Sequence, residues 1–253
     1  TSLNAFEHKE FRSLLCSLLW VRQAWIVISH DVVELQSEMV SPRVEHLRSV
    51  NGLLRKAKQT MVMNGLLFHV LSWPLRIVSI ADCGHATKKS CYPYEGKLVL
   101  IMSDNSSQLD GAEWRGSNQR RLLEGHDHPV FFSARKATRI SHSTYHAETL
   151  SVVGCLQTAQ LASHRITEVF AQTLLSRHRY TPTDLLTLQH ENMTILPIDH
   201  VTDCMDLFEL VSGSKGLASD KSQRVAVMAL RENRMSGRVR YFFHFRKDIV
   251  QHR

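Results

Sequence analysis

Hydrophobic and polar residues alternate along Leu75–Asp82, and this alternation predicts a β-strand. Pro74 precedes the stretch, and Asp82 ends it with a carboxylate. Aspartate is also a common turn residue, so the pattern leaves two interpretations open. Asp82 either ends a strand and starts a turn, or contributes its carboxylate to a site.

The remaining periodicities predict a chain in which helices and strands are mixed. Helical spacing indicates helices at Phe6–Trp25, Val32–Met39, Pro42–Gln59, Thr144–Phe170, Arg177–Asn192, Met205–Val211 and Asp220–Arg234. Short apolar runs indicate further strands at Lys97–Met102, Pro129–Ser133, Ile195–Val201 and Arg238–Phe245. The stretch Asp104–Asp127 has no periodicity, so we expect a long exposed loop there.

Glu148 lies on the apolar side of the predicted helix Thr144–Phe170, in line with Val152, Cys155 and Ala159. A carboxylate on a buried face is costly unless it is paired or binds a metal ion. The alternative is that Glu148 is a glutamate in the first helical turn, favoured there by the helix dipole. The spacing alone leaves both interpretations open.

The composition indicates a positively charged protein and a reducing cellular environment. The 253 residues include 31 Lys and Arg against 24 Asp and Glu, a net charge of +7 that suits a polyanionic partner such as nucleic acid. The five cysteines are scattered, without a CxxC pair, which predicts an intracellular protein, cytoplasmic or nuclear, without a disulfide framework. The apolar run Leu14–Ile28 is interrupted by Arg22 and Gln23 and is too short to span a bilayer, so we expect no membrane partner.

The predicted helix Pro42–Gln59 has an apolar side and a basic side. Its basic residues are Arg43, Arg48, Arg55, Lys56 and Lys58. Such a face is either a solvated surface or a surface that contacts phosphate, and the sequence does not choose between them.

Three carboxylates recur at element boundaries: Asp82 at a strand end, Glu148 near a helix start and Asp203 after the strand Ile195–Val201. In α/β sheets ligands gather at the carboxyl ends of parallel strands, which would bring Asp82 and Asp203 together. Three oxygen ligands suit Mg²⁺ or Mn²⁺ rather than zinc. Two such ions can activate water and stabilise the leaving oxygen in phosphodiester hydrolysis.

With these motifs the chain resembles the end of the reverse transcriptase and the ribonuclease H domain of copia-type LTR retrotransposon Pol polyproteins. FRSLLCSLLWV (Phe11–Val21) resembles the segment that closes the polymerase, and Val44–Thr60 the helix that connects it to ribonuclease H. The motifs similar to the catalytic part are IADCGHA (Ile80–Ala86), FFSARKATRISHSTYHAET (Phe131–Thr149), VTDCMDLFELVSGS (Val201–Ser214) and DKSQRVAVMALRE (Asp220–Glu232).

The resemblance implies an α/β fold with a ribonuclease H-like mixed five-stranded sheet flanked by helices, at residues 73–253. Residues 1–72 would be the helical end of the reverse transcriptase and the connection segment. Asp82, Glu148 and Asp203 become the catalytic carboxylates that bind two Mg²⁺ or Mn²⁺ ions. The implied partners are an RNA–DNA hybrid and the rest of the Pol polyprotein. Five basic residues flank the expected crevice as phosphate contacts: Lys88, Lys89, Arg135, Lys136 and Arg139.

The chain departs from the family pattern at several positions. Gly84 and His146 stand where the family often has acidic residues. The family's fourth carboxylate follows the last strand, where this chain offers only Asp248 in a different context. A ribonuclease H without that ligand would bind metal poorly, so an inactive nucleic-acid-binding remnant of the polyprotein is the alternative function.

Two further alternatives rest on single features. His142 and His146 are one helical turn apart, a spacing found in zinc sites, although Ser143 replaces the glutamate of the HExxH motif. An integrase-type core of the same superfold would need a glutamate on a late helix, for which Glu232 is the candidate.

Overall fold

The structure is a computed structural model, and it describes residues 1–60, 66–84, 93–104, 125–137, 143–178, 183, 187, 196–217 and 220–244. The chain divides into two compact units. One contains Thr1–Phe68 with Ser133–Arg139, and the other contains His69–Phe132 with Ile140–Arg253. A boundary between residues 72 and 73 stays a prediction.

The helices of the first unit are α1 (Ala5–Val21), η1 (Ile26–Ile28), α2 (Ser29–Ser37) and α3 (Val44–Thr60). α1 begins with a capping box, in which the backbone N–H of Glu7 donates to Asn4 Oδ1 and the backbone N–H of Asn4 donates to Glu7 Oε2, both at 2.9 Å. The helical spacing places apolar residues on one side of each helix, and these apolar sides pack together into a shared core. This core includes Phe11, Leu15, Leu18, Ile28, Val32 and Val50, all fully buried.

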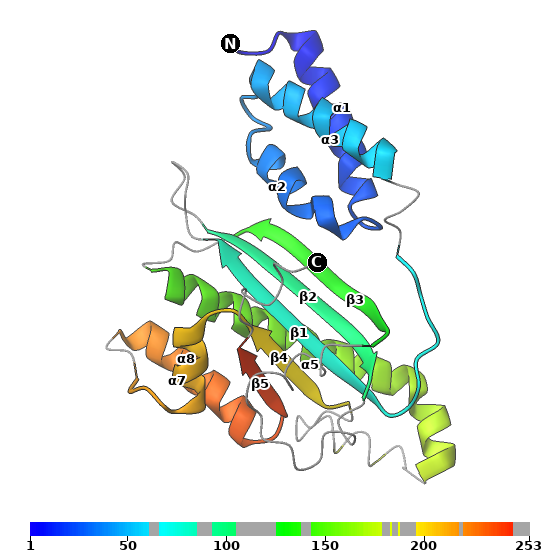
Figure 1. The fold of residues 1–253 in the computed structure, drawn as a ribbon, viewed down its shortest axis with the longest axis vertical. Coiled ribbons are helices and arrows are strands. Elements are labelled where there is room, and N and C mark those ends of the chain that lie inside the picture. Colours follow the sequence, from blue (N-terminus) through cyan, green and yellow to red (C-terminus); the bar gives the residue numbers. More distant parts are fainter. Residues whose placement is uncertain are drawn as a thin grey trace. The chain divides into compact units, whose positions relative to one another are not determined.

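The strands form a five-stranded sheet in the order β3-β2-β1-β4-β5 (Figure 1). They are β1 (Leu75–Gly84), β2 (Tyr94–Ser103), β3 (Asp127–Lys136), β4 (Ile198–Thr202) and β5 (Tyr241–His244). β1 pairs with β2 in antiparallel fashion along its whole length. β1 also pairs with β4 in parallel fashion, and β4 does so with β5, so the sheet is mixed.

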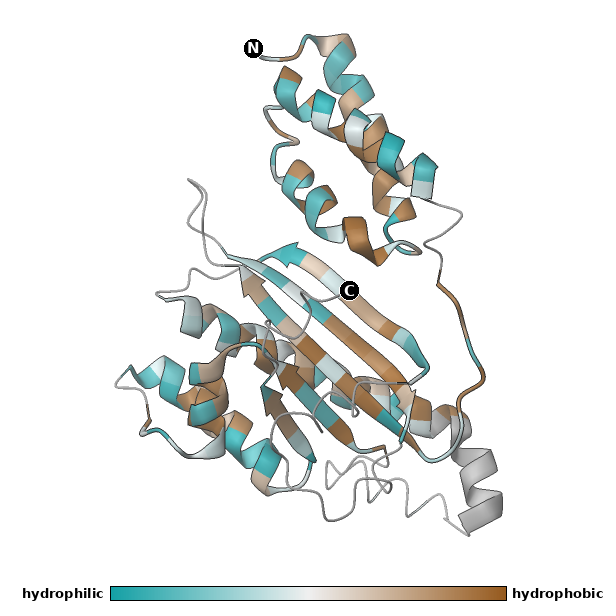
Figure 2. Cartoon of the chain, viewed as in Figure 1, coloured by the Kyte–Doolittle hydropathy of each residue, from teal (hydrophilic) through white to brown (hydrophobic). Residues whose placement is uncertain are grey.

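Helices α5 (Thr144–His178), α7 (Met205–Ser212) and α8 (Lys221–Met235) pack against one face of the sheet (Figure 1). Because side chains alternate along a strand, Ile77 and Ala81 of β1 face these helices. The same core contains Val99, Val152, Leu156, Ile198, Leu207 and Leu230. Figure 2 shows hydrophobic residues along β1 and β2, the strands at the centre of this arrangement.

The opposite face of the sheet carries a smaller hydrophobic cluster. It consists of Val78, Met102, Val201 and Phe243, each less than 10% exposed. The sheet is therefore apolar on both faces. A mixed five-stranded sheet with flanking helices confirms the predicted α/β architecture.

Several predicted boundaries were wrong by a few residues. β2 begins at Tyr94 rather than Lys97, and β3 extends to Lys136 rather than Ser133. β2 is longer than its apolar run because β1 pairs with it as far as Gly84. α5 continues to His178, eight residues beyond the predicted end. The predicted helix Arg177–Asn192 and the predicted loop Asp104–Asp127 lie mostly outside the described residues.

Within the described part of the chain, none of the helices combines the length and the apolar character needed to cross a membrane.

Candidate metal centre

β1 carries Asp82 close to its C-terminal end. Asp82 lies opposite Gly96 of β2, and its side chain is exposed. The hydroxyl of Ser151 on α5 donates to the backbone carbonyl of Asp82 at 3.3 Å. The backbone that carries the first carboxylate is therefore tied to the long helix.

Asp203 follows directly after β4, which ends at Thr202. The Thr202 hydroxyl accepts the backbone N–H of Cys204 at 3.1 Å, and the His244 ring lies 3.1 Å from the backbone carbonyl of Asp203. Since β1 and β4 are parallel neighbours, their carboxyl ends lie at the same edge of the sheet. This topology brings Asp203 to the edge that carries Asp82.

Glu148 reaches the same edge from the first turns of α5. The start of this helix is fixed by Ser143, whose hydroxyl accepts the backbone N–H of His146 at 3.1 Å and whose carbonyl accepts that of Ala147. The Glu148 side chain is only 5% exposed, and its Oε1 accepts the backbone N–H of Cys83 at 3.2 Å. A buried carboxylate beside two other acidic side chains is unfavourable unless a cation balances the charge.

The three carboxylates form one cluster. One oxygen atom from each of Asp82, Glu148 and Asp203 lies within 4.8 Å of the other two. The donors are all carboxylate oxygens, the ligands that Mg²⁺ and Mn²⁺ prefer. The residues present therefore fit a divalent metal ion of this class, and the cluster can hold one at the edge of the sheet.

Two thiols, of Cys83 and Cys204, directly follow the aspartates of the cluster in the sequence. Burial, followed by the negative charges of Glu148 and Glu95, raises the pKa of the Cys83 thiol to about 12. Burial also raises the pKa of Cys204. Both shifts favour the protonated thiols, and the metal-ligand cluster found among the described residues contains carboxylates and no cysteine.

The other proposed site residues lie elsewhere or outside the described residues. Arg135 is exposed and Lys136 half-buried, and both stand at the end of β3. The remaining proposed residues, which are Lys88, Lys89, Arg139 and Asp248, lie outside the described part of the chain.

Neither the zinc site at the histidine pair nor the integrase-type core gains support from the described residues. His142, one half of the histidine pair, is outside the described residues, while His146 is buried near the start of α5. Glu232 is exposed on α8 and does not belong to the acidic cluster found among the described residues.

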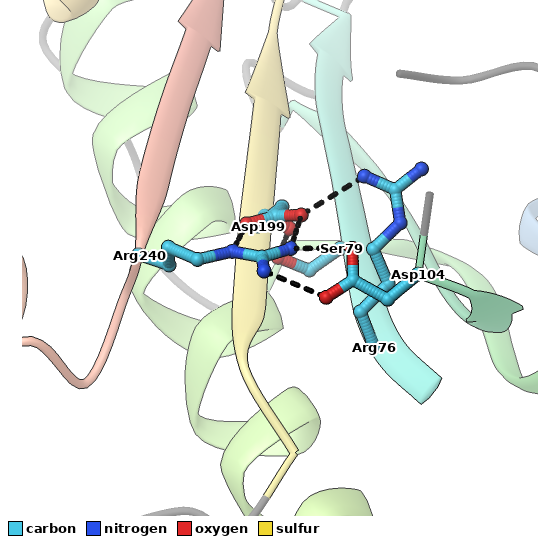
Figure 3. Close-up of polar contacts among 5 residues, drawn as sticks. All are labelled: Arg76, Ser79, Asp104, Asp199 and Arg240. Atoms are coloured by element: carbon cyan, nitrogen blue, oxygen red, sulfur yellow. Dashed lines mark hydrogen bonds and ion pairs between the residues drawn. The ribbon is translucent and has the colours of Figure 1, made fainter. Parts of the chain in front are cut away.

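A second polar cluster was missed by sequence reasoning (Figure 3). The Oδ2 atom of Asp199 in β4 accepts a hydrogen bond from Nη1 of Arg76 in β1 at 3.1 Å, and both side chains are 1% exposed. Arg240 also binds Asp199, through Nε at 3.0 Å and Nη2 at 2.8 Å, and it reaches Asp104 at 2.7 Å. Arg76 and Asp199 stand near the amino ends of their strands, whereas Asp82 and Asp203 of the acidic cluster stand at the carboxyl ends. The sequence contained one signal for this cluster: Arg76 and Asp199, of opposite charge, each lie within an otherwise mainly apolar strand.

Comparison with known proteins gives structural neighbours only. Three solved structures that resemble the chain are ribonucleases H1. One is LC11-RNase H1, isolated from compost by a metagenomic approach, at 12% identity and a TM-score of 0.37; the alignment covers 69% of this chain and 86% of that one. A second is the same enzyme in complex with an RNA/DNA hybrid, at 8% identity, a TM-score of 0.39 and coverage of 70% and 89%.

The third is ribonuclease H1 from the halophilic archaeon Halobacterium salinarum, at 10% identity, a TM-score of 0.35 and coverage of 69% and 88%. No protein-family model and no curated protein matches the chain.

Proposed function

We propose that the chain is a metal-dependent ribonuclease that hydrolyses the RNA strand of RNA–DNA hybrids, as part of a copia-type retrotransposon Pol polyprotein. The observation that carries this proposal is the cluster of Asp82, Glu148 and Asp203, whose oxygen atoms lie within 4.8 Å of one another. The order of motifs along the chain supports the retrotransposon context.

Asp82, Glu148 and Asp203 would hold two Mg²⁺ or Mn²⁺ ions. When bound, such ions supply a water molecule activated for attack and charge stabilisation at the leaving oxygen. The chain's own contribution is to fix the ligands: the Cys83 amide orients Glu148, and the parallel pairing of β1 and β4 brings the two aspartates to one edge. A fixed ligand set saves the reorganisation that flexible side chains would need.

Basic residues would bind the sugar–phosphate backbone of the hybrid. A hybrid is recognised through its phosphates and 2′-hydroxyls across a wide minor groove. Arg135 and Lys136 at the end of β3 are the described candidates, and Lys88, Lys89 and Arg139 complete the proposal. An intracellular location, cytoplasmic or nuclear, follows from this function and stays a prediction.

A second candidate function is a catalytically inactive nucleic-acid-binding remnant of the same polyprotein. It is favoured by the sequence after His244, where the family motif for a fourth carboxylate is replaced by FRKDIVQHR. The acidic cluster of the described residues has three members. If the fourth ligand is essential, hybrid binding persists while cleavage is lost.

The test is cleavage of a hybrid whose RNA strand is labelled at its end, with the purified chain and Mg²⁺ or Mn²⁺. Asp203→Asn removes a ligand charge, and Asp206→Asn is the matched control, since Asp206 is exposed, three residues further on, and paired with Lys215. We expect the wild type and Asp206→Asn to cut the RNA strand and Asp203→Asn to lose the activity. Equal cutting by Asp203→Asn would contradict the proposal, and hybrid binding without cutting by any of them would favour the inactive remnant.

A further inference from the structure

The helix α3 presents a basic face that the acidic cluster does not use. After Glu45 in the first turn, the charged residues of α3 are all positive: Arg48, Arg55, Lys56 and Lys58. All four side chains are exposed, and none of them takes part in the ion pairs found among the described residues. The positive charge of this face is therefore not balanced within the helix.

The cations are arranged along the helix axis. Arg48 and Arg55 are seven residues apart, which places them on the same side of the helix, and Lys58 follows Arg55 by three residues. At 1.5 Å per residue, the row from Arg48 to Lys58 is about 15 Å long. Phosphates follow one strand of a duplex at about 3.4 Å of axial rise, so the row can face about four of them.

Gly52 lies in the middle of this face. It stands four residues after Arg48 and three before Arg55, and a Cβ added to it would meet no atom within 4 Å. No packing contact therefore requires glycine here, although alanine is the better helix former. The absence of a side chain leaves bare helix backbone between the two arginines, where another backbone can approach closely.

The remaining exposed positions of α3 are polar, and they include Ser49, Asn51 and Gln59. Its apolar residues Val50, Leu53 and Ala57 are buried in the core of the first unit. A helix that lies on a lipid surface needs its apolar side free to enter the bilayer. The buried apolar side therefore favours a polyanion over a membrane.

We propose that the basic face of α3, made of Arg48, Arg55, Lys56 and Lys58 around Gly52, binds the phosphate backbone of duplex nucleic acid. The contact is electrostatic and independent of base sequence. It is separate from the acidic cluster in residues and in chemistry, and it does not require cleavage.

The test is equilibrium binding of a fluorescent RNA–DNA hybrid to the full chain, measured by anisotropy in EDTA so that no metal-dependent cleavage takes place. The double variant Arg48→Gln/Arg55→Gln removes two charges from the face. Lys9→Gln/Arg12→Gln is the matched control, because both residues are exposed on α1 of the same unit. Arg48→Lys/Arg55→Lys keeps the charges, and Gly52→Glu adds a negative charge without removing a cation.

We expect Arg48→Gln/Arg55→Gln to weaken binding at least about 10-fold at roughly 0.1 M salt, and to reduce the slope of log K against log salt by about 2. The control pair should stay within about twofold of the wild type and the lysine pair should bind nearly as well, since each keeps the charge of the face. Gly52→Glu should also weaken binding while its circular dichroism stays helical, because glutamate is a better helix former than glycine.

Unchanged binding by Arg48→Gln/Arg55→Gln would overturn the proposal. An equal loss in Lys9→Gln/Arg12→Gln would overturn it too, because net charge and not this face would then set the affinity. Vesicles of phosphatidylglycerol serve as the lipid arm. Vesicle binding that depends on Arg48 and Arg55, with hybrid binding intact, would assign the face to lipid instead. A chain that fails to cut hybrids but shows the expected binding pattern would retain this surface and lose only the proposed nuclease function.

Discussion

Glu148 Oε1 accepts the backbone N–H of Cys83 across 3.2 Å, which joins the start of α5 to the strand that carries Asp82. Both residues are buried, with 5% of Glu148 and 3% of Cys83 exposed. The contact sets the position of the Glu148 carboxylate relative to β1. It also makes the charge of Glu148 and its hydrogen-bonding role separable by mutation.

Glu148→Gln should therefore differ from Glu148→Ala. Glutamine keeps a carbonyl oxygen for the Cys83 amide and removes a buried negative charge, so in EDTA we expect stability equal to or above that of the wild type. Alanine leaves the buried amide without its acceptor and should cost about 1–3 kcal/mol. Urea unfolding of the three proteins measures the difference, and a glutamine variant less stable than the alanine variant would contradict this role.

Removal of one partner from the buried network at the other end of the sheet should destabilise the protein strongly. Asp199→Ala would leave Arg76, which is 1% exposed, facing the space of a lost carboxylate. Breaking a buried ion pair on one side typically costs about 3–5 kcal/mol. The check is the denaturation midpoint, with Asp206→Ala as control, because Asp206 forms an exposed pair with Lys215. A loss for Asp199→Ala as small as that of the control would refute the assignment.

The burial of His200 leads us to expect a particular pH dependence of the folding stability. It is fully buried, its Nδ1 lies 2.8 Å from the Ser79 hydroxyl, and burial lowers its pKa from 6.5 to about 3. The unfolded chain thus binds one more proton at this group between these two pKa values. The stabilisation that neutral His200 gives to the folded state is therefore fully present above pH 6.5. As the pH falls towards 3, the free energy of unfolding decreases by up to about 1.4 kcal/mol per pH unit because of this group.

His200→Asn provides the comparison, since asparagine can still bond Ser79 and does not titrate. Stability measured against pH should fall less steeply for this variant between pH 6.5 and 4 than for the wild type. The carboxylates titrate in both proteins, so only the difference between the two curves reports on His200. Parallel curves would show that His200 does not carry the effect.

Gly154 on α5 accommodates Lys97 of β2. A Cβ at Gly154 would lie 2.5 Å from Lys97 Nζ, which pairs with Glu95 at 2.8 Å. Gly154→Ala should therefore displace the lysine and destabilise the protein, although alanine is the better helix former by about 1 kcal/mol. With Lys97→Ser already present, the same substitution should become stabilising. A double-mutant cycle tests this change of sign, and equal effects in both backgrounds would contradict the contact.

The three carboxylates that lie together could be named from the sequence, and their role as metal ligands stays a prediction. The buried ion network could not be named from the sequence. Asp82 lies near the end of β1, Glu148 in the first turns of α5 and Asp203 directly after β4. The parallel pairing of β1 and β4 brings the two aspartates to one edge of the sheet. Arg76 follows the period-two pattern of an outward-facing residue, and nothing in its local sequence shows that it is buried and paired with Asp199, which also pairs with Arg240. That partnership depends on the pairing of β1, β4 and β5, which lie far apart in the sequence.

The limits of the elements were predicted less well than their existence for the same reason. The pairing of β2 begins at Tyr94, opposite Gly84 of β1, although the apolar pattern starts only at Leu98. Tertiary pairing decides such positions, so a local pattern stops short of them. The basic face of α3 could be seen in the sequence, but the burial of its apolar side required the structure.

We propose that Asp82, Glu148 and Asp203 form one divalent-metal site. Calorimetric titration of the full chain with Mn²⁺ tests it directly, with Asp203→Asn and Glu148→Gln beside the control Asp206→Asn. We predict saturable binding by the wild type and the control. Each ligand variant should bind at least about 10-fold more weakly, since loss of residues that merely support a ligand already costs 10–100-fold. Absence of Mn²⁺ binding by the wild type, or equal binding by all four proteins, would contradict a metal site at these three carboxylates.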